Sequence, residues 1–200
     1  MKDNAREFII KNLRQALSDI GQVQPKAPAP ATDSHFRLAY NDDMVLNFVN
    51  RYMVCGGNLN YAAENADVAN LLNPWIMQKG LKTVDCSTSE LSQYLKNLNL
   101  SADNFGLVGE SSRCGVLLCD ALVAWNGSVV VTSSCFENKE KIVMPENTVM
   151  IAFSSQVTHD LKTFLAQKGR EGTMPQQIQV LYPENIDHTK NQILLIEDQN

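Results

Sequence analysis

The sequence predicts an α/β protein with a mainly parallel sheet flanked by helices and with an antiparallel hairpin insert. Two observations predict this class. From about residue 40 onward, short apolar segments of strand length alternate with longer segments of helical period. Late in that alternation, two apolar runs flank Asn126-Gly127, which is the strongest short-range signal for a hairpin. A parallel sheet covered by helices and interrupted by one hairpin satisfies both.

Each expected element has a local signal. Asp42 or Asn41 is expected to cap a first helix that Gly56-Gly57 ends. Ser87-Thr-Ser-Glu90 has the pattern of a capping box, which indicates that a helix begins there and runs to Leu98. Further helices are expected over 64–78, which Pro74 would kink or split, and from Ser155 to about Lys168. Strands are expected over 58–62, 81–85, 104–108, 148–153, 177–181 and 193–197, with 104–108 buried.

The predicted hairpin joins an apolar run from Val116 to Trp125 to a second run from Ser128 to Thr132. Its turn, Trp125-Asn-Gly-Ser128, is typical of type I′, in which both the Asn and the Gly adopt positive φ.

The chain is expected to divide into three parts. Residues 1–20 are predicted to form an N-terminal amphipathic helix, because their apolar side chains fall on one face. Residues 21–34 contain three prolines spaced among alanines, which is typical of an extended linker. Residues 35–200 then form the α/β domain.

Composition excludes several classes of function. A formal net charge of −5, without a run of like charges, argues against nucleic acid as the partner. The N-terminus lacks the apolar region of a secretory signal, and no apolar stretch is long enough to insert into a membrane. The five cysteines are therefore expected to be reduced thiols in a cytoplasmic protein.

Motifs for cofactors are absent from the sequence. It contains neither a phosphate-binding loop of the G-x-x-x-x-G-K-[ST] type nor a G-x-G-x-x-G fingerprint. The three histidines (His35, His159 and His188) belong to no metal-binding pattern, so no metal is expected. Cys114, Cys119 and Cys135 lack the close phasing of iron–sulfur ligands, and we expect them to be small buried hydrophobes instead.

The segment from Val108-Gly109 to Ser134 resembles the central region of the lactate-utilisation (LUD-domain) family, which is DUF162-like and includes lactate utilisation protein C. In that family a strand ends in Val-Gly, an apolar stretch leads to an Ala-Glu-Thr-Gly turn, and an apolar strand and a small-residue loop follow. Here Lys141-Ile-Val-Met-Pro145, Val149-Met-Ile-Ala152 and Gln156-Val157 match later parts of the pattern in order and spacing. The resemblance covers roughly residues 40 to 170.

The resemblance implies the CoA-transferase-like fold, which acyl-CoA transferases share with ribose-5-phosphate isomerase and glucosamine-6-phosphate deaminase. It implies a role in L-lactate oxidation as an accessory, non-redox subunit that works with iron–sulfur partner proteins. The chain itself offers no ligand set for a flavin, a nicotinamide or an iron–sulfur cluster, so no cofactor is expected.

Two departures from the family pattern argue against catalysis. Trp125-Asn126 stands where the family has Glu-Thr, and in the related CoA-transferase fold an acid at a similar turn is the nucleophile. An indole has no nucleophilic oxygen. The family's C-terminal Ser-Gly-Pro-Ser segment, which looks like an anion-binding loop, is replaced by Gly169-Arg-Glu-Gly-Thr-Met-Pro175.

A small anionic ligand is nevertheless a candidate, because a tight turn at the carboxyl edge of a parallel sheet brings N–H groups to the crevice where ligands bind. Its alternatives are a plain hairpin turn and solvated surface charges. The predicted ligand-binding residues are Ser111, Ser112, Arg113, Asn126, Gly127, Ser128, Ser133, Ser134 and Lys141.

The sequence is also compatible with two other functions. A transferase or isomerase acting on an acyl-CoA or sugar phosphate would need Glu110 or Asp120 as its catalytic carboxylate. Asp120 is the better candidate because it interrupts an apolar run, and its structural alternative is an outward-facing strand residue. A stand-alone regulatory or scaffold protein is the third possibility.

Overall fold

The computed structural model describes residues 43–198, which belong to one compact unit that spans Tyr40–Asn200. The predicted N-terminal helix (1–20) and linker (21–34) lie outside the described residues. Two sheets organise the described part, a main sheet of six strands and a second sheet of four.

All six strands of the main sheet are parallel, in the order β1-β10-β7-β4-β2-β3. The prediction of a mainly parallel sheet flanked by helices is therefore confirmed. The central strands β7 and β10 are buried along most of their length, as is usual for a parallel sheet covered on both faces. The strands are β1 (Leu59–Ala62), β2 (Thr83–Cys86), β3 (Asn104–Leu107), β4 (Cys114–Leu118), β7 (Asn147–Phe153) and β10 (Asn191–Ile196).

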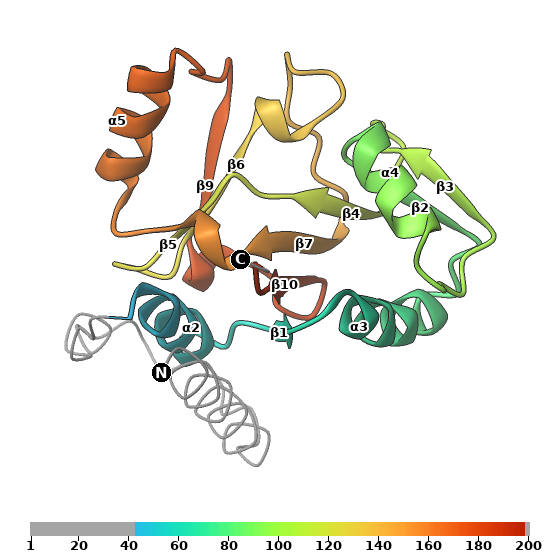
Figure 1. Ribbon diagram of the computed structural model, residues 1–200. Helices are drawn as coiled ribbons and strands as arrows, with labels where there is room; N and C mark the ends of the chain where they lie inside the picture. The colour runs from blue at the N-terminus through green and yellow to red at the C-terminus, as the bar shows by residue number, and fades with distance from the viewer. Residues whose placement is uncertain (1–42, 199–200) are drawn as a thin grey trace. The chain divides into compact units, whose positions relative to one another are not determined.

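Three helices accompany the main sheet: α2 (Met44–Val54), α3 (Asn65–Gln78) and α4 (Ser89–Lys96). Figure 1 shows α3 and α4 beside β1, β2 and β3. Residues of α3 and α4 share one core cluster with the inner strands, including Leu72, Leu95 and Val116. Pro74 lies inside α3 without ending it, so the predicted split does not occur.

The second sheet has the order β8-β5-β6-β9. Its strands are β5 (Ala121–Val123), β6 (Val129–Thr132), β8 (Val157–Thr158) and β9 (Ile178–Leu181). Helix α5 (Leu161–Glu171) packs on one face of it, where Phe164 contacts Ala121, Val123 and Val130 (Figure 1). The predicted hairpin is present as the antiparallel pair β5 and β6.

One expected strand is in fact two. The apolar run from Val116 to Trp125 belongs to β4 in the main sheet and then to β5 in the second sheet, with Cys119 and Asp120 between them. A continuous apolar run carries no signal of a change of sheet, because both strands are buried. The expectation that 104–108 is a buried strand was also wrong, since β3 is the outer strand and its first and last residues are exposed.

Three helix starts differ from those predicted. Asp43, not Asn41 or Asp42, caps α2, and its carboxylate accepts from the N–H of Val45 at 2.9 Å and of Leu46 at 3.1 Å. Thr88, not Ser87, caps α4, and its hydroxyl accepts a hydrogen bond from the N–H of Leu91 at 3.1 Å. Asp160, not Ser155, caps α5 through the N–H of Thr163 at 2.7 Å. Ser155 instead lies in a short 3₁₀ turn, η3 (Ser154–Gln156).

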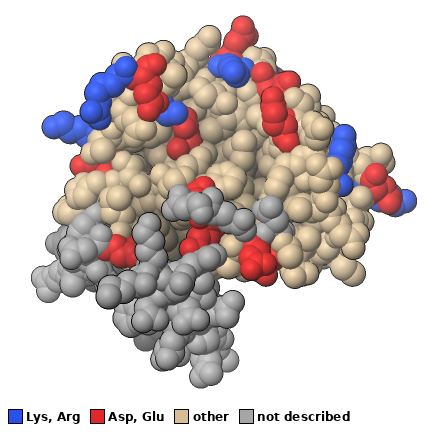
Figure 2. All heavy atoms as spheres, viewed as in Figure 1, with Lys and Arg blue, Asp and Glu red and all other residues tan. Residues whose placement is uncertain are grey.

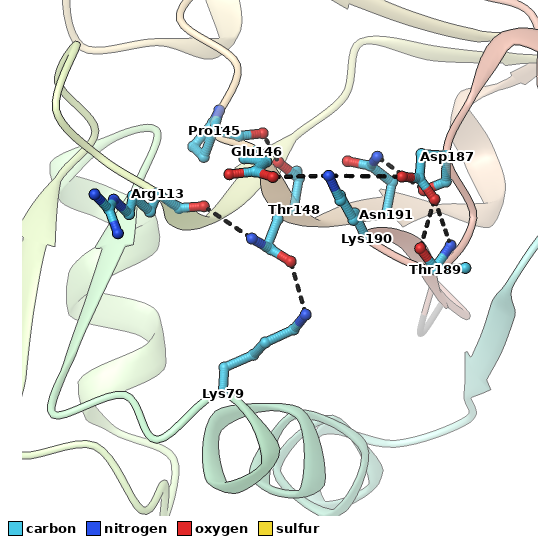
Figure 3. Close-up of polar contacts among 10 residues, drawn as sticks. Lys79, Arg113, Pro145, Glu146, Thr148, Asp187, Thr189, Lys190 and Asn191 are labelled. Atoms are coloured by element: carbon cyan, nitrogen blue, oxygen red, sulfur yellow. Dashed lines mark hydrogen bonds and ion pairs between the residues drawn. The ribbon is translucent and has the colours of Figure 1, made fainter.

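A polar network ties the amino ends of the main strands together (Figure 3). The Nζ of Lys79 donates to the side-chain oxygen of Asn147, the first residue of β7, at 2.7 Å. Lys190, just before β10, pairs with Glu146 at 2.7 Å and with Asp187 at 3.8 Å. These contacts hold the loops at the amino edge and leave the carboxyl edge as the place for a site.

His188 lies in the same loop and contacts α2. Its Nε2 donates to the carbonyl oxygen of Pro183 at 2.7 Å, and its ring meets the buried ring of Tyr52 edge-on at 5.3 Å between centroids. Neither the Tyr52 hydroxyl nor Nδ1 of His188 has a hydrogen-bond partner among the described residues. Burial lowers the pKa of His188 below its usual value of 6.5.

We predict a pH-dependent loss of stability from His188. Because its pKa is lower in the folded state, the unfolded state binds more protons below about pH 6.5, so the free energy of unfolding falls with the pH. His188→Gln removes this component, so the stability gap between wild type and variant narrows from pH 7.5 to pH 5 in urea unfolding. The exposed His159→Gln is the control. A gap that does not change with pH contradicts the prediction.

Candidate functional site

The order of the main sheet has a switch point between β2 and β4. From β2 the chain passes through α4 to β3 on one side, whereas from β4 it continues toward β7 on the other. Ligands of open parallel sheets bind in the crevice outside the carboxyl ends of the strands at such a point. The carboxyl ends of β2 and β4 are therefore where a site is expected.

A pocket of about 170 Å³ lies there. It is bounded by the end of β2, the loop after β3, and a segment that we call the strap, residues 136–146 between the 3₁₀ turn η2 (Ser133–Cys135) and β7. The lining residues are Ser87, Val108, Gly109, Glu110, Phe136, Glu137, Asn138, Lys141 and Val143.

Ser87 connects the end of β2 to the end of β4 and to the strap. It is 2% exposed, and its hydroxyl oxygen accepts a hydrogen bond from the N–H of Leu118 at the end of β4 at 3.1 Å. Its carbonyl oxygen accepts from the N–H of Glu137 in the strap at 2.8 Å. Ser87, which was predicted to begin a capping box, thus holds the strap against the switch point.

Two exposed polar contacts fasten the strap. The carboxylate of Glu137 accepts from the N–H of Ser89 at 2.9 Å and from its hydroxyl at 3.0 Å, at the start of α4. These bonds lower the pKa of Glu137, as expected for a carboxylate at a helix N-terminus. Lys141 pairs with Glu110 at 2.6 Å, and that hydrogen bond lowers the pKa of Glu110.

The role of Glu137 could not be predicted from the sequence. Its partner Ser89 is 48 residues away, and a single glutamate after a strand has no local pattern that marks it. Lys141 and Glu110, by contrast, were both predicted as site residues, and the structure brings them together at the pocket.

The predicted trio on the loop between β3 and β4 is split between the two edges of the sheet. Ser112 donates to the Asp85 carboxylate on β2 at 2.5 Å and accepts from the N–H of Gly109 at 3.0 Å. Ser111 and Arg113 are exposed. Arg113 immediately precedes β4 and lies in the amino-edge network, where its carbonyl oxygen accepts from the backbone N–H of Asn147 at 2.9 Å and from its side-chain amide at 3.4 Å, the contact drawn in Figure 3.

The hairpin turn lies against α2 and not at the pocket. A Cβ added at Gly127 would come within 2.9 Å of the backbone nitrogen of Tyr52. Gly127 has φ 72°, but no non-glycine residue of the described part has positive φ, so the expected type I′ turn was wrong. The side-chain oxygen of Asn126 accepts instead from the N–H and the hydroxyl of Ser128, at 3.1 and 2.7 Å.

Ser133 and Ser134 lie in η2, where the strap begins. Ser133 is buried, its N–H donates to the carbonyl oxygen of Gln177, and its hydroxyl accepts from the N–H of Gln177 at 3.3 Å. Ser134 is exposed. Neither residue lines the pocket.

Trp125, which stands where the resembling family has an acid, is 47% exposed. Its ring stacks on His159 with 6.3 Å between centroids, and the guanidinium of Arg51 lies 5.7 Å from the indole. This arrangement is a surface aromatic contact with a cation–π component, and it contains no nucleophile.

Asp120 lies between β4 and β5, and it does not line the pocket. Its carboxylate pairs with Lys168 of α5 at 2.8 Å and accepts from the Thr132 hydroxyl at 2.7 Å. Only 13% of the Asp120 side chain and 20% of the Lys168 side chain are exposed. The alternative of an outward-facing strand residue was therefore wrong, since Asp120 is a mostly buried partner in an ion pair.

The charges of the pocket compensate one another. Glu110 and Lys141 pair, and Glu137 is held by Ser89, so each charged lining residue already has a partner. On the face drawn in Figure 2, basic side chains lie near acidic ones along the upper edge and at the right, and separate acidic side chains lie below. Such a pocket can exchange one of these contacts for a ligand, and it contains no histidine or cysteine.

Within residues 43–198, no group of three His, Cys, Asp or Glu side chains is placed to hold a metal ion. No helix in that part of the chain has both the length and the apolar character needed to cross a membrane. None of the five cysteines, all of which lie in the described part of the chain, forms a disulfide; three are buried and two half-buried.

Comparison with known proteins gives a likeness in fold. A scan against models of protein families found no match, and a search of curated proteins found no significant match. Among solved structures, a DUF162 family protein from Deinococcus radiodurans is similar with a TM-score of 0.52 and 10% identity. The similarity covers 80% of this chain and the whole of that one. The chain has a DUF162-like fold. At this identity, the likeness extends to the architecture and not to the activity.

We predict that Glu137 keeps the first turn of α4 ordered. Glu137→Ala removes the acceptor for the N–H and hydroxyl of Ser89, so amide hydrogen exchange should become faster at residues 89–92 and in the strap. Glu140→Ala, in the same strap, is the matched control and should leave this exchange unchanged. Equal exchange in both variants would show that the contact with Ser89 does not fasten the strap.

Proposed function

We propose that the chain is an accessory, non-redox subunit of a cytoplasmic L-lactate oxidation system that works with iron–sulfur partner proteins. The observation that carries the proposal is the DUF162-like fold, matched over the whole length of the D. radiodurans protein. It agrees with the order and spacing of the segments from Val108 to Val157 that resemble the lactate-utilisation family.

The pairing of the two candidate carboxylates with lysines supports an accessory role. Asp120 is neutralised by Lys168, and Glu110 by Lys141, so a reaction that used either group would first have to break an ion pair. The turn that carries an acid in the family carries Trp125 here. These features favour binding over catalysis.

We further propose that the pocket under the strap binds a small anion such as a carboxylate. Lys141 would exchange Glu110 for the ligand, because an exposed ion pair contributes little to stability and is readily replaced. Ser111 and Ser112, two other predicted ligand-binding residues, follow Glu110 on the same loop but do not line the pocket.

Deletion of the gene tests the main proposal. The deletion strain of the source organism should fail to grow on L-lactate and should grow normally on pyruvate, and a plasmid copy should restore growth. A tagged chain purified from lactate-grown cells should bring with it proteins that contain iron and acid-labile sulfide. Normal growth of the deletion strain on L-lactate would reject the proposal.

A transferase or isomerase acting on an acyl-CoA or sugar phosphate is the alternative. The buried Asp120–Lys168 pair directly after β4 is the observation in its favour. In that case Asp120→Asn should lower the rate by about 100-fold or more, and Glu140→Gln, at an exposed position that does not line the pocket, should serve as the control. Because the substitution also weakens the ion pair, roughly 1–3 kcal/mol of stability should be lost in urea unfolding. An unchanged pH–rate profile in Asp120→Asn would remove this alternative.

A further inference from the structure

Strand β9 is the last strand of the second sheet, and no other strand within residues 43–198 pairs with its outer edge. Its inner edge pairs with β6, where the N–H of Ser133 donates to the carbonyl oxygen of Gln177 at 3.0 Å. In an antiparallel pair, alternate residues direct both backbone groups toward the partner strand. The odd-numbered residues of β9 therefore face β6, and the N–H and C=O groups of Ile178 and Val180 face outward.

This edge lacks one usual form of protection, charged side chains. Natural edge strands are guarded by charged side chains, particularly lysine, because open N–H and C=O groups pair with other chains. No charged residue lies between Thr173 and Pro183. Ile178 is 37% exposed and Tyr182 is 42% exposed. In a chain of net charge −5, this neutral segment is where two copies approach with the least repulsion.

The segment is also self-complementary about Gln179. Ile178 and Val180 lie one residue to either side, and Pro175 and Pro183 lie four residues to either side. Both prolines have odd numbers, so neither removes an N–H from the outward-facing set of residues 176, 178, 180 and 182. An antiparallel partner with the same sequence therefore meets a complete set of donors and acceptors.

We infer that β9 pairs in antiparallel orientation with β9 of a second copy of this chain, about a two-fold axis at Gln179. Ile178 exchanges two hydrogen bonds with Val180 of the second copy, and Val180 does the same with Ile178 of that copy. The two four-stranded sheets become one sheet of eight. A closed two-fold dimer of this kind removes the edge from solvent and ends the assembly at two chains.

A cysteine scan of the strand tests the register. At the axis, Gln179 faces itself in a non-hydrogen-bonded pair with a Cα–Cα distance of about 4.5 Å, which a disulfide can span. Gln179→Cys should form a covalent dimer on mild oxidation. Gln176→Cys faces Tyr182 of the second copy and should form no covalent dimer under the same conditions, and it controls for the five native thiols.

The mass in solution tests the pairing itself. The full chain should show twice its monomer mass by light scattering across a concentration series, and Ile178→Lys should shift it to the monomer. Met77→Lys, at an exposed position of α3, is the control and should stay dimeric. A wild-type monomer at every concentration would overturn the inference, as would a dimer that Ile178→Lys leaves intact. If Ile178→Lys unfolds, the cysteine pair decides, and equal cross-linking at positions 176 and 179 overturns the register.

Discussion

The passage of the chain from the main sheet to the second sheet is the constraint on which the rest of the structure depends. The N–H of Cys119 donates to the carbonyl oxygen of Ile151 at 3.1 Å, and the next N–H, that of Asp120, donates to Val130 at 2.8 Å. The last bond of one ladder and the first of the other are thus one residue apart. The carboxylate of Asp120, held by Lys168 and Thr132, fixes α5 and β6 around this junction.

The site follows from that junction. Because β6 ends beside the carboxyl ends of the main strands, the chain must return to the amino end of β7, and the strap is the segment that does so. Glu137 meets α4 at the carboxyl edge on the way. Near the other end of the strap, Pro145 packs so closely on Gly115 that an added Cβ would lie 2.8 Å from its ring. The strap therefore both closes the pocket and connects the two sheets.

Apolar patterning in the sequence predicted the parallel sheet and the hairpin, because buried parallel strands such as β7 are continuous apolar runs. The break between β4 and β5 could not be predicted, since burial makes both strands apolar and only Asp120 interrupts them. Site residues could be predicted where a charged side chain is conspicuous in its local sequence, as at Glu110 and Lys141. Glu137 and Ser87 could not be found, because each acquires its role from a partner that is distant in sequence. Arg113 was assigned to the wrong edge, because six residues suffice to return from β3 to the start of β4.

Neutralised carboxylates and a hairpin turn without an acid together favour a subunit that binds and positions over one that reacts. The most direct measurement is reconstitution of L-lactate oxidation from purified components, with an artificial electron acceptor. We expect that this chain alone gives no oxidation of L-lactate. Adding it to its iron–sulfur partners should raise their rate of L-lactate oxidation until the partners are saturated. Oxidation of L-lactate by this chain alone, or a partner rate that its addition leaves unchanged, would contradict this expectation.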